Sequence, residues 1–188
     1  EAKGDTYTLK RTADTLTGGT KDDTFSGVVD GDTASNNTFT ALDTIDGGAG
    51  TDTLNVIFAS DAGNTNTFPA ATISNVEIFS IKNQDDNDAV TVDFGNISGE
   101  TTVKSNLSTS GVTFSNLASG TDVDIIGNTS LTNGAFGYGY VAAATASTLD
   151  IIDGVTAGAV TQTGTGLLSS TINSTGAANT IGALGIAA

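Results

Sequence analysis

Apolar and polar residues alternate in short runs along this chain, and no apolar stripe keeps helical spacing for long. The runs are rich in β-branched residues and are bounded by Gly, Asn or Ser, which is typical of strands. The clearest runs are residues 90–94, 102–104, 111–114 and 122–126, with starts about ten residues apart. The pattern predicts an all-β protein made of many short, regularly spaced strands.

The segments that follow these runs also repeat. Each contains an Asn followed by an aliphatic residue, namely Asn96-Ile97, Asn106-Leu107 and Asn116-Leu117. Such a repeat predicts a β-solenoid, in which the aliphatic residue points inward at a corner, the Asn bonds across turns, and each turn covers the apolar face of the one before. Short, evenly spaced strands are also typical of a β-sandwich, and spacing alone leaves that alternative open.

One motif occurs twice between residues 14 and 54. The first copy reads Asp14-x-Leu16-x-Gly18-Gly19-x-x-x-Asp23-x-Phe25, and the second, 29 residues later, reads Asp43-x-Ile45-x-Gly47-Gly48-x-Gly50-x-Asp52-x-Leu54. Residues 47–55 match in full the nonapeptide whose glycine turn and aspartate bind calcium in a parallel β-roll. Lys21 replaces the third glycine in the first copy and adds a positive charge there, so the second copy is the better candidate.

Calcium binds roughly six to eight hard oxygen ligands, which carboxylates and backbone carbonyls provide. We expect Asp23 and Asp52 to contribute carboxylates from the ends of their turns, the glycines to contribute carbonyls, and Asp14 and Asp43 to contribute from the preceding half-turn. The predicted calcium ligands are Asp14, Gly18, Gly19, Asp23, Asp43, Gly47, Gly48, Gly50 and Asp52. A single Gly-Gly pair would mark no more than a turn, but a second copy in register favours calcium.

The charge balance agrees with a cation partner. Acidic residues outnumber basic ones by 21 to 6, for a net charge of −15, so nucleic acids and anionic membranes would repel the chain. There is no cysteine or histidine, which excludes disulfides, thiolate metal sites and histidine-based catalysis. No apolar run is long enough to insert into a membrane.

The sequence indicates a protein that is not an enzyme. Glycoside hydrolysis, the chemistry that paired carboxylates would suggest, needs a cleft that also binds the sugar. The chain has no tryptophan and three tyrosines, and a stacking platform made of Tyr138 and Tyr140 is less expected than loop packing or an interface contact. We therefore predict no catalytic residues.

Other acidic groups have two interpretations each. The run at residues 85–88 is either a solvated turn between strands or a second ion site. Two pairs of aspartates, Asp122 with Asp124 and Asp150 with Asp153, would each repel one another and so favour a bound cation or a partner lysine.

The composition divides the chain into two regions. Residues 1–82 form the predicted calcium-binding β-roll, with a polar surface loop inserted at 27–40, and residues 83–188 form a Thr/Ser/Gly/Ala-rich β-solenoid that we expect to continue into a larger parent chain. The stretch 154–188 carries no charge and is either further solenoid turns or a poorly ordered tail. If it is ordered, its uncharged surface favours edge-to-edge association.

The stretch 6–81 resembles a segment of RTX-type bacterial surface-layer proteins, in which a degenerate and then a good Gly-Gly-x-Gly-x-Asp repeat lead into short strands such as 54–56 and 73–79. The resemblance covers about two fifths of the chain, and beyond it only the composition is similar. It implies a structural protein, exported by type I secretion to the bacterial cell surface, that assembles with copies of itself in a calcium-dependent way. Cell-surface polysaccharide is a further partner that it suggests. Because the repeats are few, the alternative is an adhesin or carbohydrate-binding module of a large RTX protein.

Overall fold

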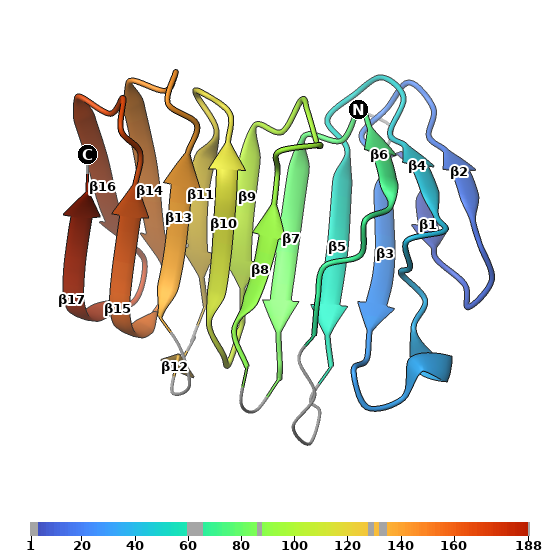
Figure 1. Cartoon of the computed structure of the whole chain (residues 1–188), viewed down its shortest axis with the longest axis horizontal. Helices are drawn as coiled ribbons and strands as arrows, with labels where there is room; N and C mark the ends of the chain where they lie inside the picture. Colours follow the sequence, from blue (N-terminus) through green and yellow to red (C-terminus); the bar gives the residue numbers. More distant parts are fainter. Residues whose placement is uncertain (1–3, 60–65, 86–87, 128–129, 132–134, 188) are drawn as a thin grey trace.

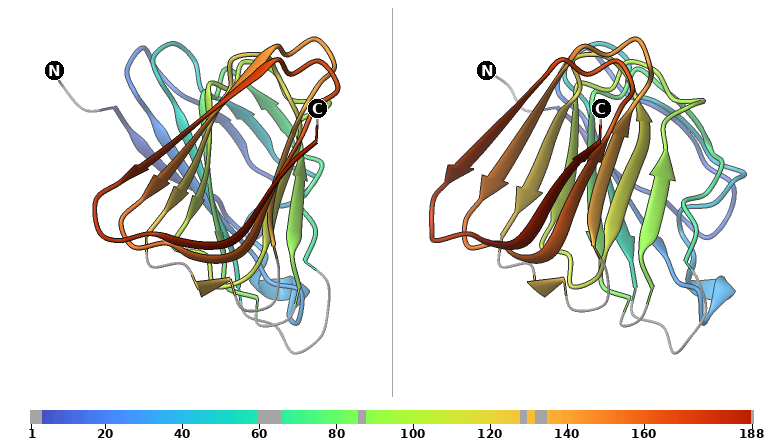
Figure 2. Two further views of the ribbon diagram at one scale, coloured as in Figure 1. Left: turned by 90° about the vertical axis from the view of Figure 1, so that its left-hand side faces the viewer. Right: turned by 60° about the vertical axis from the view of Figure 1, so that its left-hand side comes forward.

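The computed structural model describes residues 4–59, 66–85, 88–127, 130–131 and 135–187. They form a β-solenoid, in which parallel strands stack along one axis in two facing layers (Figures 1 and 2). Every described strand pair is parallel. The predicted all-β solenoid is therefore confirmed, and the β-sandwich, which is built from antiparallel sheets, is excluded.

One layer is a single continuous sheet, called sheet A here. Its strands are β1 (Thr6–Thr8), β3 (Thr24–Val29), β5 (Thr53–Phe58), β7 (Ile78–Asn83), β9 (Thr102–Asn106), β11 (Asp122–Ile126), β14 (Ala146–Ile152) and β16 (Ser169–Thr175), in this spatial order. Because β7 pairs with β9, the sheet runs without a break past residue 83, where the composition changes.

The facing layer is divided into two sheets (Figure 1). Sheet B contains β2 (Thr15–Thr17), β4 (Thr44–Asp46) and β6 (Thr72–Ser74). Sheet C contains β8 (Val90–Asp93), β10 (Val112–Leu117), β13 (Phe136–Tyr140), β15 (Thr156–Thr163) and β17 (Thr180–Ala187), and the short β12 (Ser130–Leu131) also pairs with β15. A 3₁₀ turn, η1 (Ala34–Asn36), is the one helical element among the described residues, and no described helix is long and apolar enough to cross a membrane.

Alternate residues of each strand point between the layers and make the core. On sheet A the inward positions stack in register as Phe25, Leu54, Phe79, Val103, Val123 and Leu149. All six side chains are fully buried. Each burial of such a side chain contributes about 1.5–3 kcal/mol, so the stacked ranks supply the main stabilisation of every turn.

The predicted strands are confirmed at β8, β9, β10 and β11, but the inserted loop is shorter than expected. Strand β3 continues through Val29, so the prediction of a loop from residue 27 is wrong for its first three residues. The alternation of buried and half-buried side chains does not stop there. The connection that follows folds back on β3, because the amides of Thr38 and Phe39 both donate to the carbonyl of Val28 and the ring of Phe39 is buried.

The predicted corner pattern is only partly correct. The Asn side chains do bond across turns, from Asn106 to Ser80 Oγ and from Asn116 to Asp93 Oδ1. Leu117 is buried as expected, but Leu107 is 48% exposed. Leu107 has a φ of 55°, in the left-handed region, and its side chain points to solvent.

The uncharged stretch after Asp153 forms further turns of the solenoid, since β15, β16 and β17 lie within it. A buried polar network ties these turns together: Gln162 Oε1 accepts from Tyr138 Oη at 2.9 Å and from Ser147 Oγ at 3.1 Å. The Tyr140 hydroxyl donates to the carbonyl of Thr121 at 2.6 Å. Both tyrosines are buried, so they form no exposed stacking platform.

Candidate metal centre

Three connections stack at one edge of the molecule. Residues 18–23 join β2 to β3, residues 47–52 join β4 to β5, and residues 75–77 join β6 to β7. The two motif copies lie in direct register, with Thr15 beside Thr44 and Thr24 beside Thr53. The 29-residue repeat of the sequence is thus one turn of the solenoid.

Carboxylates at this edge form a ladder along the axis. Asp52 Oδ1 accepts the amide of Asp23 at 2.7 Å, and Asp23 Oδ1 accepts the amide of Asp5 at 2.5 Å. The next carboxylate is Glu77, whose Oε2 accepts the amide of Asp52 at 2.8 Å. Each acidic side chain therefore satisfies a backbone donor of the preceding turn, where the turn leaves that amide without a strand partner.

Glu77 and Asn75 also belong to this edge, although neither is part of the glycine motif. Asn75 lies 29 residues after Asp46 and donates to its carboxylate at 2.7 Å. With a φ of 51°, Asn75 adopts the left-handed conformation that Asn tolerates better than most residues. The strand register shows that this third turn is shorter, because Asp46 pairs with Ser74, 28 residues on, and Thr53 pairs with Ile78, 25 residues on. The 29-residue spacing of the two motif copies therefore does not locate Glu77.

The first glycine of each pair is required because the turns approach closely. A Cβ at Gly18 would lie 1.9 Å from the carbonyl oxygen of Gly47, and a Cβ at Gly47 would lie 1.8 Å from that of Asn75. Oxygen atoms converge at these positions, since Asp23 Oδ2 and Asp52 Oδ2 each lie 2.6 Å from the corresponding Cβ position. A side chain of any size would displace them.

The second turn contains a carboxylate oxygen without a donor. Asp52 Oδ2 is buried and accepts no hydrogen bond. Gly48, whose amide occupies the equivalent place to the Gly19 amide, donates instead to Asp46 Oδ1 at 3.2 Å. Burial raises the pKa of Asp52, and the nearby carboxylate of Glu77 raises it further, against the lowering effect of the Asp23 amide.

These residues fit a calcium ion chemically. The unsatisfied Asp52 oxygen and the carbonyl oxygen of Asn75 converge on Gly47, at 2.6 Å and 1.8 Å from the position that a Cβ would take there, and both are hard oxygen ligands of the kind that calcium prefers. No group of three or more acidic side chains suited to a metal occurs among the described residues. An ion at Asp52 would therefore take most of its protein ligands from backbone carbonyls.

Asp14 and Asp43 lie at the other end of sheet B, before β2 and β4. They form a ladder of their own, in which Asp43 Oδ1 accepts the amide of Asp14 at 2.8 Å. Gly18 lies four positions after Asp14 in extended chain, roughly 13 Å away at 3.3 Å per residue. The nine predicted ligands therefore fall into two groups, and one ion cannot contact both.

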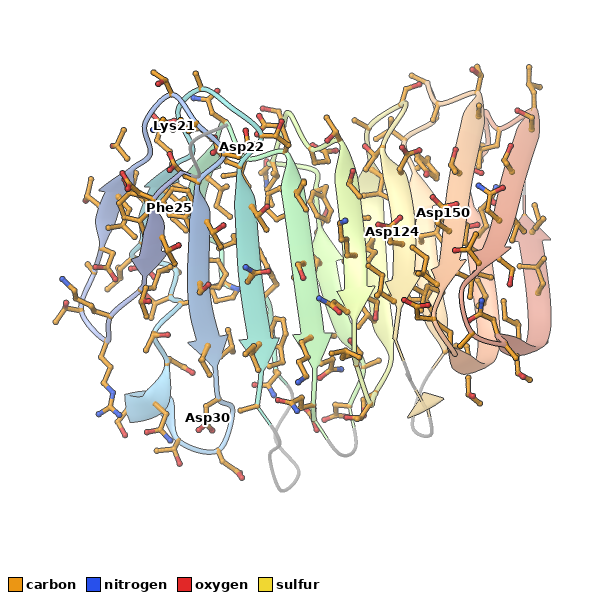
Figure 3. All side chains as sticks on the ribbon, turned by 180° about the vertical axis from the view of Figure 1, so that it is seen from behind. Lys21, Asp22, Phe25, Asp30, Asp124 and Asp150 are labelled. Atoms are coloured by element: carbon orange, nitrogen blue, oxygen red, sulfur yellow. The ribbon has the colours of Figure 1, made fainter. Side chains whose placement is uncertain are left out.

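The remaining acidic groups also have defined places. Asp85 is fully buried rather than solvated, and its carboxylate accepts the side-chain amide of Asn66 at 3.3 Å; Asp86 lies outside the described residues. On the outer face of sheet A, Asp124 pairs with Lys104 at 3.2 Å, which is the lysine partner that the sequence suggested. Asp150 lies beside Asp124 on the adjacent strand (Figure 3).

Comparisons with protein-family models, with curated proteins and with solved structures find no match for this chain.

Proposed function

We propose that this chain is a calcium-stabilised structural domain of a secreted bacterial surface-layer protein, which assembles with copies of itself at the cell surface. The observation that carries the proposal is the buried Asp52 oxygen without a donor, held in a turn with the full nonapeptide sequence. A carboxylate buried without compensation is costly, and a bound cation would remove that cost. Calcium would then be part of the folded structure.

The charge distribution supports the assembly part of the proposal. A net charge of −15 opposes close contact between copies, and bound calcium lowers it. The last turns carry no charge after Asp153, and they expose Leu168, Leu184 and Ile186. Sheet edges without charged residues are prone to pair with other chains.

The experiment compares calcium-free and calcium-loaded protein. We expect added calcium, at micromolar to millimolar concentration, to raise the melting temperature followed by circular dichroism and to shift the sedimentation profile toward larger species. Magnesium at the same ionic strength is the control. If neither melting nor sedimentation responds to calcium, the proposal is wrong.

The Asp52→Asn variant connects the response to the site. It removes the charge of Asp52 while keeping an oxygen that can accept the amide of Asp23. We expect this variant to lose the calcium-dependent rise in melting temperature. Asp124→Asn is the matched control, because it also neutralises a mostly buried aspartate, but one that pairs with Lys104 on the outer face of sheet A.

A further inference from the structure

The break between sheets B and C leaves two facing strand edges open in the middle of the molecule, those of β6 and β8. Strand β6 pairs only with β4, and β8 pairs only with β10, while sheet A continues behind them without interruption (Figure 1). The seam between β6 and β8 is the one place along the described solenoid where successive turns of the front layer are not joined by a strand ladder.

The open edge of β8 presents unpaired backbone groups. The amides of Val90 and Phe94 donate to carbonyls on the β10 side, those of Gly111 and Ser115. Because alternate residues of a strand bond to opposite sides, the amides of Thr91 and Asp93 face the seam. In the described structure no backbone acceptor bonds to either of them, so this edge can accept a further strand.

Proline explains why the chain itself does not close the seam. Residues 67–71 run along it before β6 without forming a strand, and they include Pro69, the single proline of the sequence. Proline has no amide hydrogen to donate to a ladder. The sheet is therefore interrupted at the position where its only proline occurs.

A hollow of about 350 Å³ lies between the two sides of the seam. Its walls include the apolar Phe68, Pro69 and Ile97 and the polar Thr91, Asp93 and Asn96. Asp93 Oδ1 accepts hydrogen bonds from Asn116 Nδ2 at 2.8 Å and from the amide of Gly95 at 2.9 Å. These bonds lower the pKa of Asp93, and they leave Oδ2 available to a ligand.

We propose that this seam binds an extended, basic peptide segment, which adds to β8 as a strand and places a lysine or arginine beside Asp93. The unpaired amides of Thr91 and Asp93 supply the ladder, as in other cases of strand addition to a sheet edge. The Asp93 carboxylate and the net charge of −15 select for a positive partner. A sugar fits less well, because the Phe68 ring is partly buried and packs against Phe39 and Phe58.

The test uses a capped peptide of alternating lysine and valine, added to isotope-labelled protein and followed by amide chemical shifts. We expect saturable shifts centred on Thr91 and Asp93, and slower hydrogen exchange at both amides. The control peptide has the same sequence with methylated backbone nitrogens on alternate residues, which removes its ladder donors. It should bind at least tenfold more weakly. Equal binding of the two peptides would overturn the proposal.

Variants of the protein separate the edge from the side chains around it. Thr91→Pro removes one amide of the open edge but none that bonds to β10, and should weaken binding about tenfold. Thr91→Ala keeps the amide and should bind almost as well as the natural chain. Asp93→Asn should reduce both the affinity and its dependence on salt.

The outcomes are distinct even if Thr91→Pro fails to fold, because the methylated peptide tests the same ladder on the natural protein. Maltotriose and chitotriose are the sugar probes. If they shift the amides of Thr91 and Asp93 and the peptide does not, the seam is a glycan site and the proposal fails. It also fails if peptide shifts map to another surface.

Discussion

The two glycine turns have almost the same sequence pattern but different conformations. In the second turn Gly48 and Gly50 have positive φ values of 95° and 138°, whereas neither Gly19 nor Lys21 does. The hydrogen bonds differ accordingly: Asp23 Oδ2 accepts the amide of Gly19 at 2.5 Å, while the equivalent oxygen of Asp52 has no donor.

The difference teaches that a repeated motif can serve two purposes. In the first turn both oxygens of Asp23 accept backbone amides. The second turn keeps one carboxylate oxygen unsatisfied, at the place where the third glycine of the motif is present. A lysine at that position in the first turn is consistent with a turn that does not depend on a cation.

We expect the largest effect on stability from alanine substitutions that test the backbone conformation of the two turns. Gly48→Ala should lower the free energy of unfolding by at least about 3 kcal/mol, because the residue has a positive φ and its Cβ would lie 2.4 Å from the carbonyl oxygen of Gly19. Gly19→Ala should change it by less than about 1 kcal/mol, since its Cβ would meet only Asp23 Oδ2, at 3.8 Å. Urea denaturation of both variants measures the contrast. Similar losses would mean that the turns do not differ.

The next effect concerns the two carboxylates. Asp23→Asn should cost about 1–3 kcal/mol with or without calcium, because both oxygens of Asp23 accept amides and the new NH₂ group would face one of those donors. Asp52→Asn should instead stabilise the calcium-free protein by about 1 kcal/mol, since it removes a buried charge at the oxygen that has no donor. Thermal melts of both variants in chelator test this reversal of sign. A loss of stability in calcium-free Asp52→Asn would contradict it.

A smaller effect appears in the pH dependence. Since burial raises the pKa of Asp52 in the folded protein, the folded state binds this proton more tightly than the unfolded state. In calcium-free protein, Asp52 should therefore increase the free energy of unfolding as pH falls. The increase occurs between the raised pKa of Asp52 in the folded state and its ordinary pKa in the unfolded state. The advantage of Asp52→Asn over the natural chain should shrink over that window.

Urea denaturation of the two proteins between neutral and acidic pH checks this prediction. Asp30 and Asp93 have lowered pKa values, which hydrogen bonds to their carboxylates cause, so their contributions to stability are lost as pH falls. That loss is the same in both proteins and cancels in the difference. A difference that grows toward low pH would show that the Asp52 carboxylate is stabilised in the fold.

The smallest effect comes from making the first turn resemble the second. Lys21→Gly removes a positive charge and permits the backbone angles that Gly50 adopts. Without calcium it should cost about 0.5–1 kcal/mol, the usual penalty of an added glycine. With calcium, titration calorimetry should detect more bound calcium than in the natural chain. Unchanged stoichiometry would mean that the other residues of the first turn also prevent binding.

The sequence by itself favoured the solenoid over the β-sandwich and indicated the register of the two motif turns. Alternating β-branched runs place β8 to β11 correctly, and the spacing between the copies is the length of one turn, because strand periodicity and glycine turns are local properties of the chain. The glycine positions also follow from local spacing, since close approach between turns recurs at each repeat.

Only the tertiary structure decided which of these residues meet. It places Asp14 and Asp43 at the far end of sheet B, adds Glu77 to the acidic ladder and buries Asp85. It also decides that the turn at residues 47–52 leaves an oxygen unsatisfied and that the front layer breaks beside Pro69. The physical reason is that these features depend on how turns of unequal length stack. Connections of different length bring together side chains whose separation in the sequence follows no fixed period.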